Sequence, residues 1–287
     1  MAHYRRLLLA LVLATLLTAQ TATPPRSIDD FFRDLTAEWM RMSPNLAMSA
    51  RYFTGPEQDE FERQIGPLTE ADRIAHIDKA KQGLAMLRTL DRSKLTDEPW
   101  TSADVIAWQL DHVVREQPFL EREFPLEQFN GANIRLVSFL TVTHPLQNLK
   151  DAQNYVAALG QVATRMDEAI AVSKAQAAAG VLPPRLILQA TIQQMQSFAD
   201  PAPAQNPFVT AMDQKMSSAK DITPEQRAEL RAQAEKIVAG GVYPAWKPAI
   251  ATLEAQLPKP TDDAGLWRFK NGAEAYAISR MPLRQRA

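Results

Sequence analysis

Histidines and acidic residues are the side chains of this sequence that could do acid–base or metal chemistry, and the four histidines are widely separated. A zinc-binding helix of the HExxH type needs two histidines one turn apart and a glutamate base. His3 falls in the extreme N-terminal segment, while His76, His112 and His144 each stand alone, without a second histidine or an acid at that spacing. We therefore expect no zinc helix among these 287 residues.

His112 and His144 leave a weaker case for a functional role. Asp111 precedes His112 and Glu116 follows it by one helical turn, so a carboxylate could orient this ring as a general base. The alternative, which we favour, is an ordinary surface or half-buried helix residue. His144 precedes Pro145 in an expected loop, where site residues are common, but the sequence shows no partner for it.

Other catalytic signatures do not occur in the sequence. Gly240-Gly241 lacks the lysine and the serine or threonine of a phosphate-binding loop, and there is no G-x-S-x-G elbow of a serine hydrolase. The lack of cysteine excludes disulfides, thiolate metal sites and lipid attachment at a cysteine. We therefore assign no catalytic, cofactor-binding or metal-binding residue, and we expect no cofactor to be bound by this chain alone.

Residues 1–22 have the pattern of a secretory signal peptide. Arg5 and Arg6 precede the apolar residues 7–17, a run too short for a membrane span, which needs about 20 residues. Small residues follow, and we expect cleavage after Ala22, with Ala19 as the alternative. An uncleaved anchor is the other interpretation, disfavoured by the short apolar run. The sequence thus predicts a periplasmic or secreted protein with no stable membrane span after cleavage.

The composition is that of a globular, nearly neutral protein. Hydrophobic residues make up 46% of the chain, charged residues 23%, and the formal net charge is −1. This balance implies no broad attraction to nucleic acid. Three arginines at positions 280, 284 and 286 make residues 279–287 a basic tail, which could touch an acidic partner or simply be solvated.

Apolar spacing and capping residues predict an all-α fold of roughly eight helices. The expected starts are Ser27, Ser43-Pro44, Thr69, Thr101 and Thr223-Pro224. We expect the second helix to end near Gly55-Pro56 and residues 119–144 to form a connector with short helical pieces. Pro244 and Pro248 should either start a new helix or kink a continuing one.

A long helix is expected over residues 149–179, with Gly180 as its left-handed C-terminal cap. Its apolar residues recur at spacings of three and four and form one stripe, made of Tyr155, Leu159, Val162, Met166 and Ile170. We interpret this stripe as core rather than as a cofactor site. Near the C-terminus, Asn271-Gly272 predicts a turn before a short helix.

Four segments in this order make the chain resemble the N-terminal half of the bacterial DUF885 family. They are residues 31–39 with Ser43-Pro44, residues 180–188 (GVLPPRLIL), residues 241–246 (GVYPAW) and residues 265–276 (GLWRFKNGAEAY). The resemblance covers about residues 27–277, within a DUF885-like region that we place at residues 23–278. After it, residues 279–287 diverge from the family pattern.

The resemblance implies a large helical fold similar to zinc metallopeptidases of the carboxypeptidase Taq type. The family's HExxH-type metal helix would lie downstream of the GLW segment, where this chain has no matching residues, so no ligand can be carried over. We therefore expect a truncated member, inactive alone, with zinc bound only in full-length relatives. The alternative is a non-catalytic periplasmic binding or scaffold module. Apolar faces exposed by truncation predict self-association or a protein partner.

Overall fold

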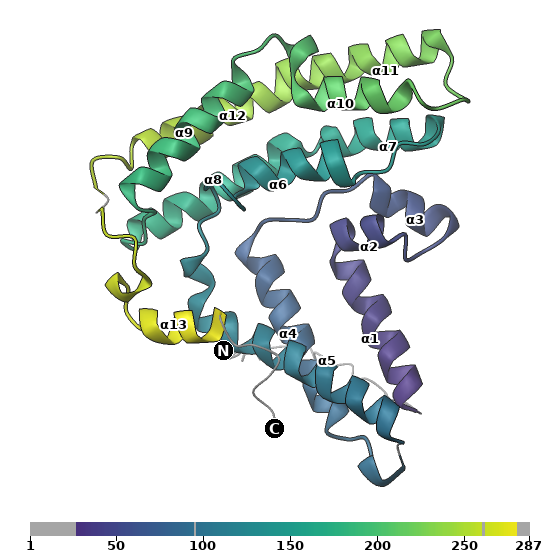
Figure 1. Cartoon of the computed structure of the whole chain (residues 1–287), viewed down its shortest axis with the longest axis vertical. Coiled ribbons are helices and arrows are strands. Elements are labelled where there is room, and N and C mark those ends of the chain that lie inside the picture. The colour runs from purple at the N-terminus through teal and green to yellow at the C-terminus, as the bar shows by residue number, and fades with distance from the viewer. Residues whose placement is uncertain (1–26, 95, 260–261, 280–287) are drawn as a thin grey trace, which may run out of the picture.

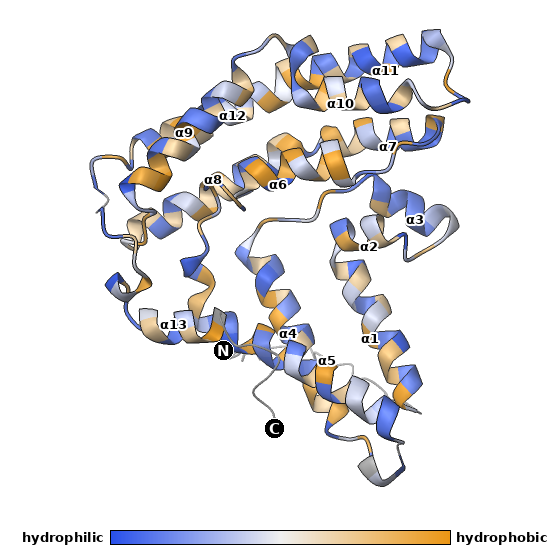
Figure 2. Cartoon of the chain, in the orientation of Figure 1, coloured by the Kyte–Doolittle hydropathy of each residue, from blue (hydrophilic) through white to orange (hydrophobic). Residues whose placement is uncertain are grey.

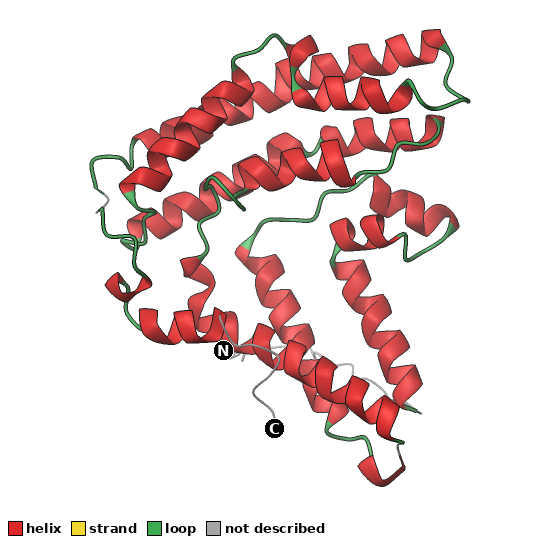
Figure 3. Ribbon diagram, in the orientation of Figure 1, coloured by secondary structure: helices red, strands yellow, loops and turns green. Residues whose placement is uncertain are grey.

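Every regular element of this computed structural model is a helix. The structure describes residues 27–94, 96–259 and 262–279, and no strand occurs within these ranges (Figure 3). The expected all-α class is confirmed. The helices outnumber the eight expected, because the helix expected over residues 149–179 is two helices and because further short helices form at residues 55–62, 132–138 and 207–216. The expected signal peptide, its cleavage sites and the arginines of the basic tail lie outside the described residues.

Short segments connect consecutive α-helices, and several of these segments contain a single 3-10 or π-helical turn. In chain order they are α1 Ile28–Met42, α2 Pro44–Ala50, α3 Gly55–Glu62, α4 Glu70–Leu87, α5 Asp97–Glu116, α6 Ala132–Ser138, α7 Leu149–Leu159, α8 Val162–Ala178, α9 Arg185–Ala199, α10 Pro207–Met216, α11 Pro224–Ile237, α12 Tyr243–Glu254 and α13 Gly272–Ser279. The connecting turns are η1 Arg92–Lys94, η2 Gln117–Arg122, η3 Phe139–Thr143, η4 Pro203–Gln205, η5 Val238–Val242 and η6 Leu266–Arg268.

The chain forms two parts, which we name the arm and the body (Figure 1). The arm consists of α1, α4 and α5, with α4 packed against both of the others. The body consists of α6 to α12 in two tiers, in which α8 and α9 pack on α12 and α7 packs on α11. The pair α2 and α3 links arm to body through α7, and α13 contacts α5.

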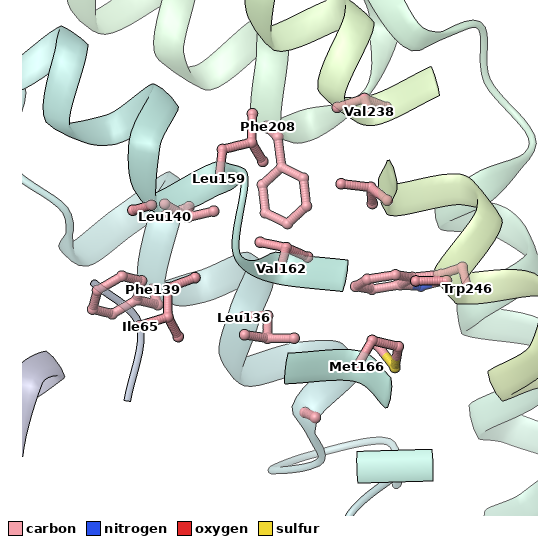
Figure 4. Close-up of a cluster of buried hydrophobic side chains, with 14 of the residues drawn as sticks. Ile65, Leu136, Phe139, Leu140, Leu159, Val162, Met166, Phe208, Val238 and Trp246 are labelled. Atoms are coloured by element: carbon pink, nitrogen blue, oxygen red, sulfur yellow. The ribbon is translucent and has the colours of Figure 1, made fainter. Parts of the chain in front are cut away.

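The main core lies between the two tiers of the body, where hydrophobic residues of α6 and α8 face the upper tier (Figure 2). Leu159, Val162 and Met166 of the predicted apolar stripe point into this core beside Phe208 and Trp246 (Figure 4). All five residues of the stripe are buried, which confirms its interpretation as core. Burial of such side chains contributes about 1.5–3 kcal/mol each to the free energy of unfolding.

Several predicted caps are confirmed by their hydrogen bonds. The side chains of Ser27 and Thr69 accept the backbone N–H of Asp30 and Asp72, which begins α1 and α4 as expected. Thr223 and Gln226 form a reciprocal capping box at the start of α11. Gly180 has φ +78, the left-handed conformation predicted at the end of α8.

Two expected helix boundaries are wrong. The helix that begins at Pro44 ends at Ala50, because Arg51 takes a left-handed conformation, and Gly55-Pro56 begins α3 instead of ending α2. The helix expected from Thr101 begins at Asp97, with Thr96 at the cap, since Pro99 fits in its first turn. Thr101 lies inside this helix and donates its hydroxyl to the carbonyl of Asp97.

The long helix expected over residues 149–179 is two helices, α7 and α8, separated at Gly160-Gln161. The apolar stripe nevertheless stays buried across the break. Farther along, α11, η5 and α12 follow one another without a loop. Pro244 lies in the first turn of α12, directly after the π-helical turn, while Pro248 is inside the helix. The π-helical turn is wider than an α-helical turn, so it accommodates Pro244, which has no backbone N–H to donate.

Candidate functional site

A hydrogen-bonded pair between Ser43 and His76 joins the arm to α2. Ser43 lies at the junction of α1 and α2, and its Oγ is 3.0 Å from Nε2 of His76 on α4. Nδ1 of the same ring is 2.9 Å from the backbone carbonyl of Asp72, one turn earlier. Because a carbonyl only accepts, the ring proton belongs on Nδ1, and Nε2 accepts the hydroxyl of Ser43.

Asp72 also brings its carboxylate near this ring. Oδ2 of Asp72 is 3.5 Å from Nδ1 of His76, beyond the normal length of a hydrogen bond. Burial raises the pKa of Asp72, opposed by the His76 ring and reinforced by the nearby carboxylate of Glu168. The order Ser43–His76–Asp72 matches a Ser–His–Asp triad in connectivity, but the backbone carbonyl rather than the carboxylate holds the ring. The arrangement therefore serves mainly to fix α1 and α2 on α4.

A cavity of about 350 Å³ lies beside this pair, between the start of α4, η2 and α8. Leu120, Ala171 and Val172 supply apolar walls, whereas Arg73 and Glu168 supply charge. This combination of apolar walls and few charged groups is typical of small-molecule or side-chain binding sites.

Two of the four charged residues that line the cavity, Arg73 and Glu168, are held by neighbouring residues. The guanidinium of Arg73 donates to the carbonyl of Leu120 at 3.1 Å. The carboxylate of Glu168 accepts the backbone N–H of Leu68 at 2.7 Å and pairs with Arg165 at 2.6 Å. These bonds hold the two side chains in place at the junction of arm and body.

His112, the proposed general base of the sequence, is placed on the arm. Its Nε2 is 3.0 Å from Glu116, one turn later on α5, while Asp111 pairs with Arg115 instead. Trp108 stacks on the ring at 5.7 Å between centroids. Of the two expected carboxylates, the structure thus brings only that of Glu116 to His112. Trp108, His112 and Glu116 are four residues apart, so they lie on one face of α5.

His144 lies in the expected loop and is buried. It caps the π-helical turn η3, and its two ring nitrogens contact the backbone carbonyls of Pro145 and Glu62, each at 2.8 Å. Burial lowers the pKa of His144, outweighing the two carbonyl contacts, which raise it. The ring therefore joins α3 to η3 inside the protein and has no access to a substrate.

The three described histidines lie in separate elements: α4, α5 and the end of η3. Across residues 27–94, 96–259 and 262–279, no group of three or more His, Cys, Asp or Glu side chains could hold a metal ion. These residues do not fit a zinc site, since zinc takes three or four such ligands converging on one point. Within the same ranges, no helix is both long enough and apolar enough to cross a membrane.

Sequence reasoning missed both partners of His76. Asp72 stands four residues before it, a helical spacing that was visible in the sequence. Ser43 stands 33 residues away, and only the packing of α1 and α2 on α4 brings it close. The cavity likewise joins residues from three distant segments, which no local pattern reports.

Comparison with known proteins places the fold. The chain resembles the crystal structure of "the putative lipoprotein from Colwellia psychrerythraea", with 19% sequence identity and a TM-score of 0.72. The match covers 86% of this chain but 45% of that one, so this chain spans less than half the length of its structural relative. No curated protein matches the sequence.

A family match covers most of the chain. Residues 44–280 match the family described as "Bacterial protein of unknown function (DUF885)". The matched range contains three of the four segments on which the resemblance was based, while residues 31–39 precede it. This chain belongs to the DUF885 family of bacterial proteins.

Proposed function

We propose that this chain is the helical, substrate-side half of an exported DUF885 hydrolase that cleaves peptide or related amide bonds. In this proposal zinc and its ligands belong to polypeptide outside these 287 residues. The observation that carries the proposal is the extent of the structural match, which covers 86% of this chain and 45% of its relative. A helical half of this kind would form one wall of a cleft and leave the metal chemistry to the other half.

The contacts of the histidines support the proposal that the zinc ligands belong to other polypeptide. His76 is engaged by Ser43 and Asp72, His112 by Glu116, and His144 by two backbone carbonyls. To bind zinc, His76 or His144 would have to give up contacts that stabilise its own part of the fold, because both of its ring nitrogens are engaged. The cavity between α4, η2 and α8 has the volume to hold a substrate side chain.

The proposal is tested first on the purified chain. After dialysis against zinc and then against buffer, mass spectrometry of the metal should find well below one zinc per chain. A library of short peptides and amides should remain uncleaved. Tightly bound stoichiometric zinc, or cleavage that a chelator abolishes, would contradict the assignment of the metal site to another polypeptide.

The hydrolase activity itself needs a two-part protein. The relative from Colwellia psychrerythraea offers a host, because the match defines which part of it this chain can replace. With zinc present, the intact relative is expected to cleave members of the same peptide library, and a chimera that carries this chain is expected to retain the same bond preference. If the intact, zinc-loaded relative cleaves none of them, the hydrolase assignment is wrong.

Export is tested separately. Residues 1–22 fused to a reporter enzyme that is active only outside the cytoplasm should restore its activity, and the mature protein should begin at Thr23 or, with the alternative cleavage site, at Gln20. A reporter that stays inactive would refute the signal peptide without bearing on the hydrolase assignment.

The cavity also favours the second candidate function, a non-catalytic binding module. Its volume of about 350 Å³ suits a small ligand without any catalytic group. Ala175 lines it from α8, and Ala175→Trp would fill the space. This function predicts a ligand that raises the melting temperature of the wild-type chain but not of the Ala175→Trp variant.

A further inference from the structure

An apolar groove of about 300 Å³ runs along the arm between α1 and α5. α1 contributes Leu35, Trp39 and Met40, and α5 contributes Ile106, Leu110 and Val113. On each helix these residues recur at helical spacing, so each helix presents an apolar row to the groove. Two such rows are the surface on which an amphipathic helix docks.

Gly83 of α4 lies against two of the leucines that line the groove. A Cβ atom added at Gly83 would stand 2.8 Å from Cδ1 of Leu110 and 3.3 Å from Cδ1 of Leu35. The missing side chain therefore lets the leucines of α1 and α5 approach each other over α4. Both helices pack against α4, and the space between them is left on one side of the arm.

The two helices that form the groove are strongly acidic. α1 carries Asp29, Asp30, Asp34 and Glu38 against Arg33 and Arg41, and α5 carries Asp97, Glu98, Asp104, Asp111 and Glu116 against Arg115. The arginines of α1 and α5 already pair with carboxylates, Arg33 with Asp30 at 2.7 Å and Arg115 with Asp111 at 3.9 Å. The chain as a whole is nearly neutral, so negative charge is concentrated on these helices.

Helical spacing places carboxylates along the line of the groove. Asp29 stands seven residues, or two turns, before Thr36, which lines the groove from α1. Glu116 stands two turns after Gln109, which lines it from α5. A helix lying in the groove would therefore meet apolar side chains along its middle and negative charge near its two ends.

We propose that the groove between α1 and α5 binds an amphipathic helix of a partner protein, whose apolar stripe is flanked by lysines and arginines. The apolar stripe fills the groove, and the flanking cations pair with the carboxylates of α1 and α5. Charge complementarity speeds association and excludes acidic helices, while the apolar contacts hold the complex together. This role is independent of the proposed hydrolase activity.

The test uses a synthetic helix of about 18 residues, with leucines along one stripe and lysines at the flanking positions. Its matched competitor carries glutamate at those flanking positions. Calorimetry of the full chain should show binding of the lysine peptide at least about tenfold tighter than of the glutamate peptide, with the difference shrinking as salt rises above about 0.15 M. Equal affinity for both peptides would overturn the proposal.

Variants of α5 locate the site. Ile106→Asp places a charge among the apolar rows and is expected to weaken binding about tenfold or more. Thr101→Asp adds the same charge to an exposed position of the same helix outside the groove, and it should leave affinity unchanged or slightly higher. If both variants bind the lysine peptide like the wild type, the peptide binds elsewhere and the proposal fails.

A second variant guards against misfolding of Ile106→Asp. Gln109 is exposed and lines the groove, so Gln109→Trp fills it without removing a buried contact. It should keep the circular dichroism spectrum and melting temperature of the wild type and lose binding. Sedimentation of the chain alone distinguishes another occupant, because a dimer that Gln109→Trp dissociates would assign the groove to a second copy and overturn the proposal.

Discussion

Tyr155 is a polar group placed at the centre of the apolar core. It is fully buried in α7, and its hydroxyl donates to the backbone carbonyl of Phe208 at 2.8 Å, which ties α7 to α10. Burial strongly raises the pKa of Tyr155, so the hydroxyl stays protonated and keeps donating across the accessible pH range. This hydrogen bond satisfies the buried hydroxyl of Tyr155, which water cannot reach.

Tyr155→Phe is therefore expected to destabilise the protein by about 1 kcal/mol, because the hydrogen bond that joins α7 to α10 is lost. Urea unfolding measures the change. Tyr52→Phe is the matched control, since Tyr52 is exposed, and it should change the free energy of unfolding by less than about 0.5 kcal/mol. Equal effects of the two substitutions would show that the buried bond contributes little.

His144 makes the stability of the protein depend on pH. Burial lowers the pKa of His144. Its Nε2 contacts the backbone carbonyl of Glu62, and the ammonium group of Lys215 donates a hydrogen bond to the backbone carbonyl of His144. Above the unfolded pKa of about 6.5 the ring is neutral in both the folded and unfolded states. As pH falls below it, the unfolded chain binds a proton that the folded ring resists, so stability is lost until pH reaches the lower folded pKa.

We expect the free energy of unfolding to decrease as pH falls from about 7.5 to about 5. His144→Gln removes the titrating group, so urea unfolding of this variant should show a weaker pH dependence over the same window. A variant that is less stable but has an unchanged slope would contradict the assignment of the pH dependence to His144. Asp72 acts in the opposite direction, because its raised pKa favours protonation in the folded state.

At the scale of elements, the start of α11 and the start of α5 form a natural comparison. Thr223 accepts the backbone N–H of Gln226, whose side chain returns to the N–H of Thr223. Thr96 occupies the same cap position of α5 but makes no side-chain cap bond. The same residue type therefore does different work at the two helix ends.

Thr223→Ala should cost about 1 kcal/mol of stability and speed hydrogen exchange in the first turn of α11. Thr96→Ala should change stability by much less, because no capping bond is lost. Thermal unfolding together with exchange mass spectrometry measures both effects. A larger loss from Thr96→Ala would mean that the capping box does not determine where α11 begins.

At the scale of the whole molecule, α13 closes the space between the arm and the body (Figure 1). Ala275 and Ile278 of α13 pack on Phe119 of η2. Arg122 of η2 donates to the carbonyl of Lys270, and Arg268 donates to the carbonyl of Leu182, the latter at 2.5 Å. These contacts hold residues 268–279, which we name the strap, through Arg268 and Lys270 before α13 and through Ala275 and Ile278 within it.

Phe119→Ala is expected to release this strap rather than to unfold the body, because the cluster of Phe119, Ala275 and Ile278 is separate from the main core. Hydrogen exchange should rise in residues 272–279 and stay unchanged in α8. Trp267→Ala removes an exposed aromatic ring of the adjoining turn and serves as the control, with little effect expected on α13. Uniformly faster exchange throughout the chain would contradict an independent strap.

Whatever depends on a few neighbouring residues could be predicted from the sequence. The caps at Ser27, Thr69 and Thr223 and the left-handed Gly180 act within one turn of the chain, so their local chemistry specifies them. The apolar stripe from Tyr155 to Ile170 likewise predicted its own burial, because helical periodicity is a local property. The resemblance to DUF885 rested on short segments in order and is confirmed over residues 44–280.

Tertiary structure decided what the sequence left open, because those outcomes depend on residues far apart in the chain. The break between α7 and α8 is held by the side chain of Gln161, which accepts the N–H of Ile65 and donates to the carbonyl of Arg63. The Ser43–His76 pair and the groove over Gly83 likewise need helices to pack before they exist. Local propensity places helices, whereas the sites arise only where distant faces of those helices meet.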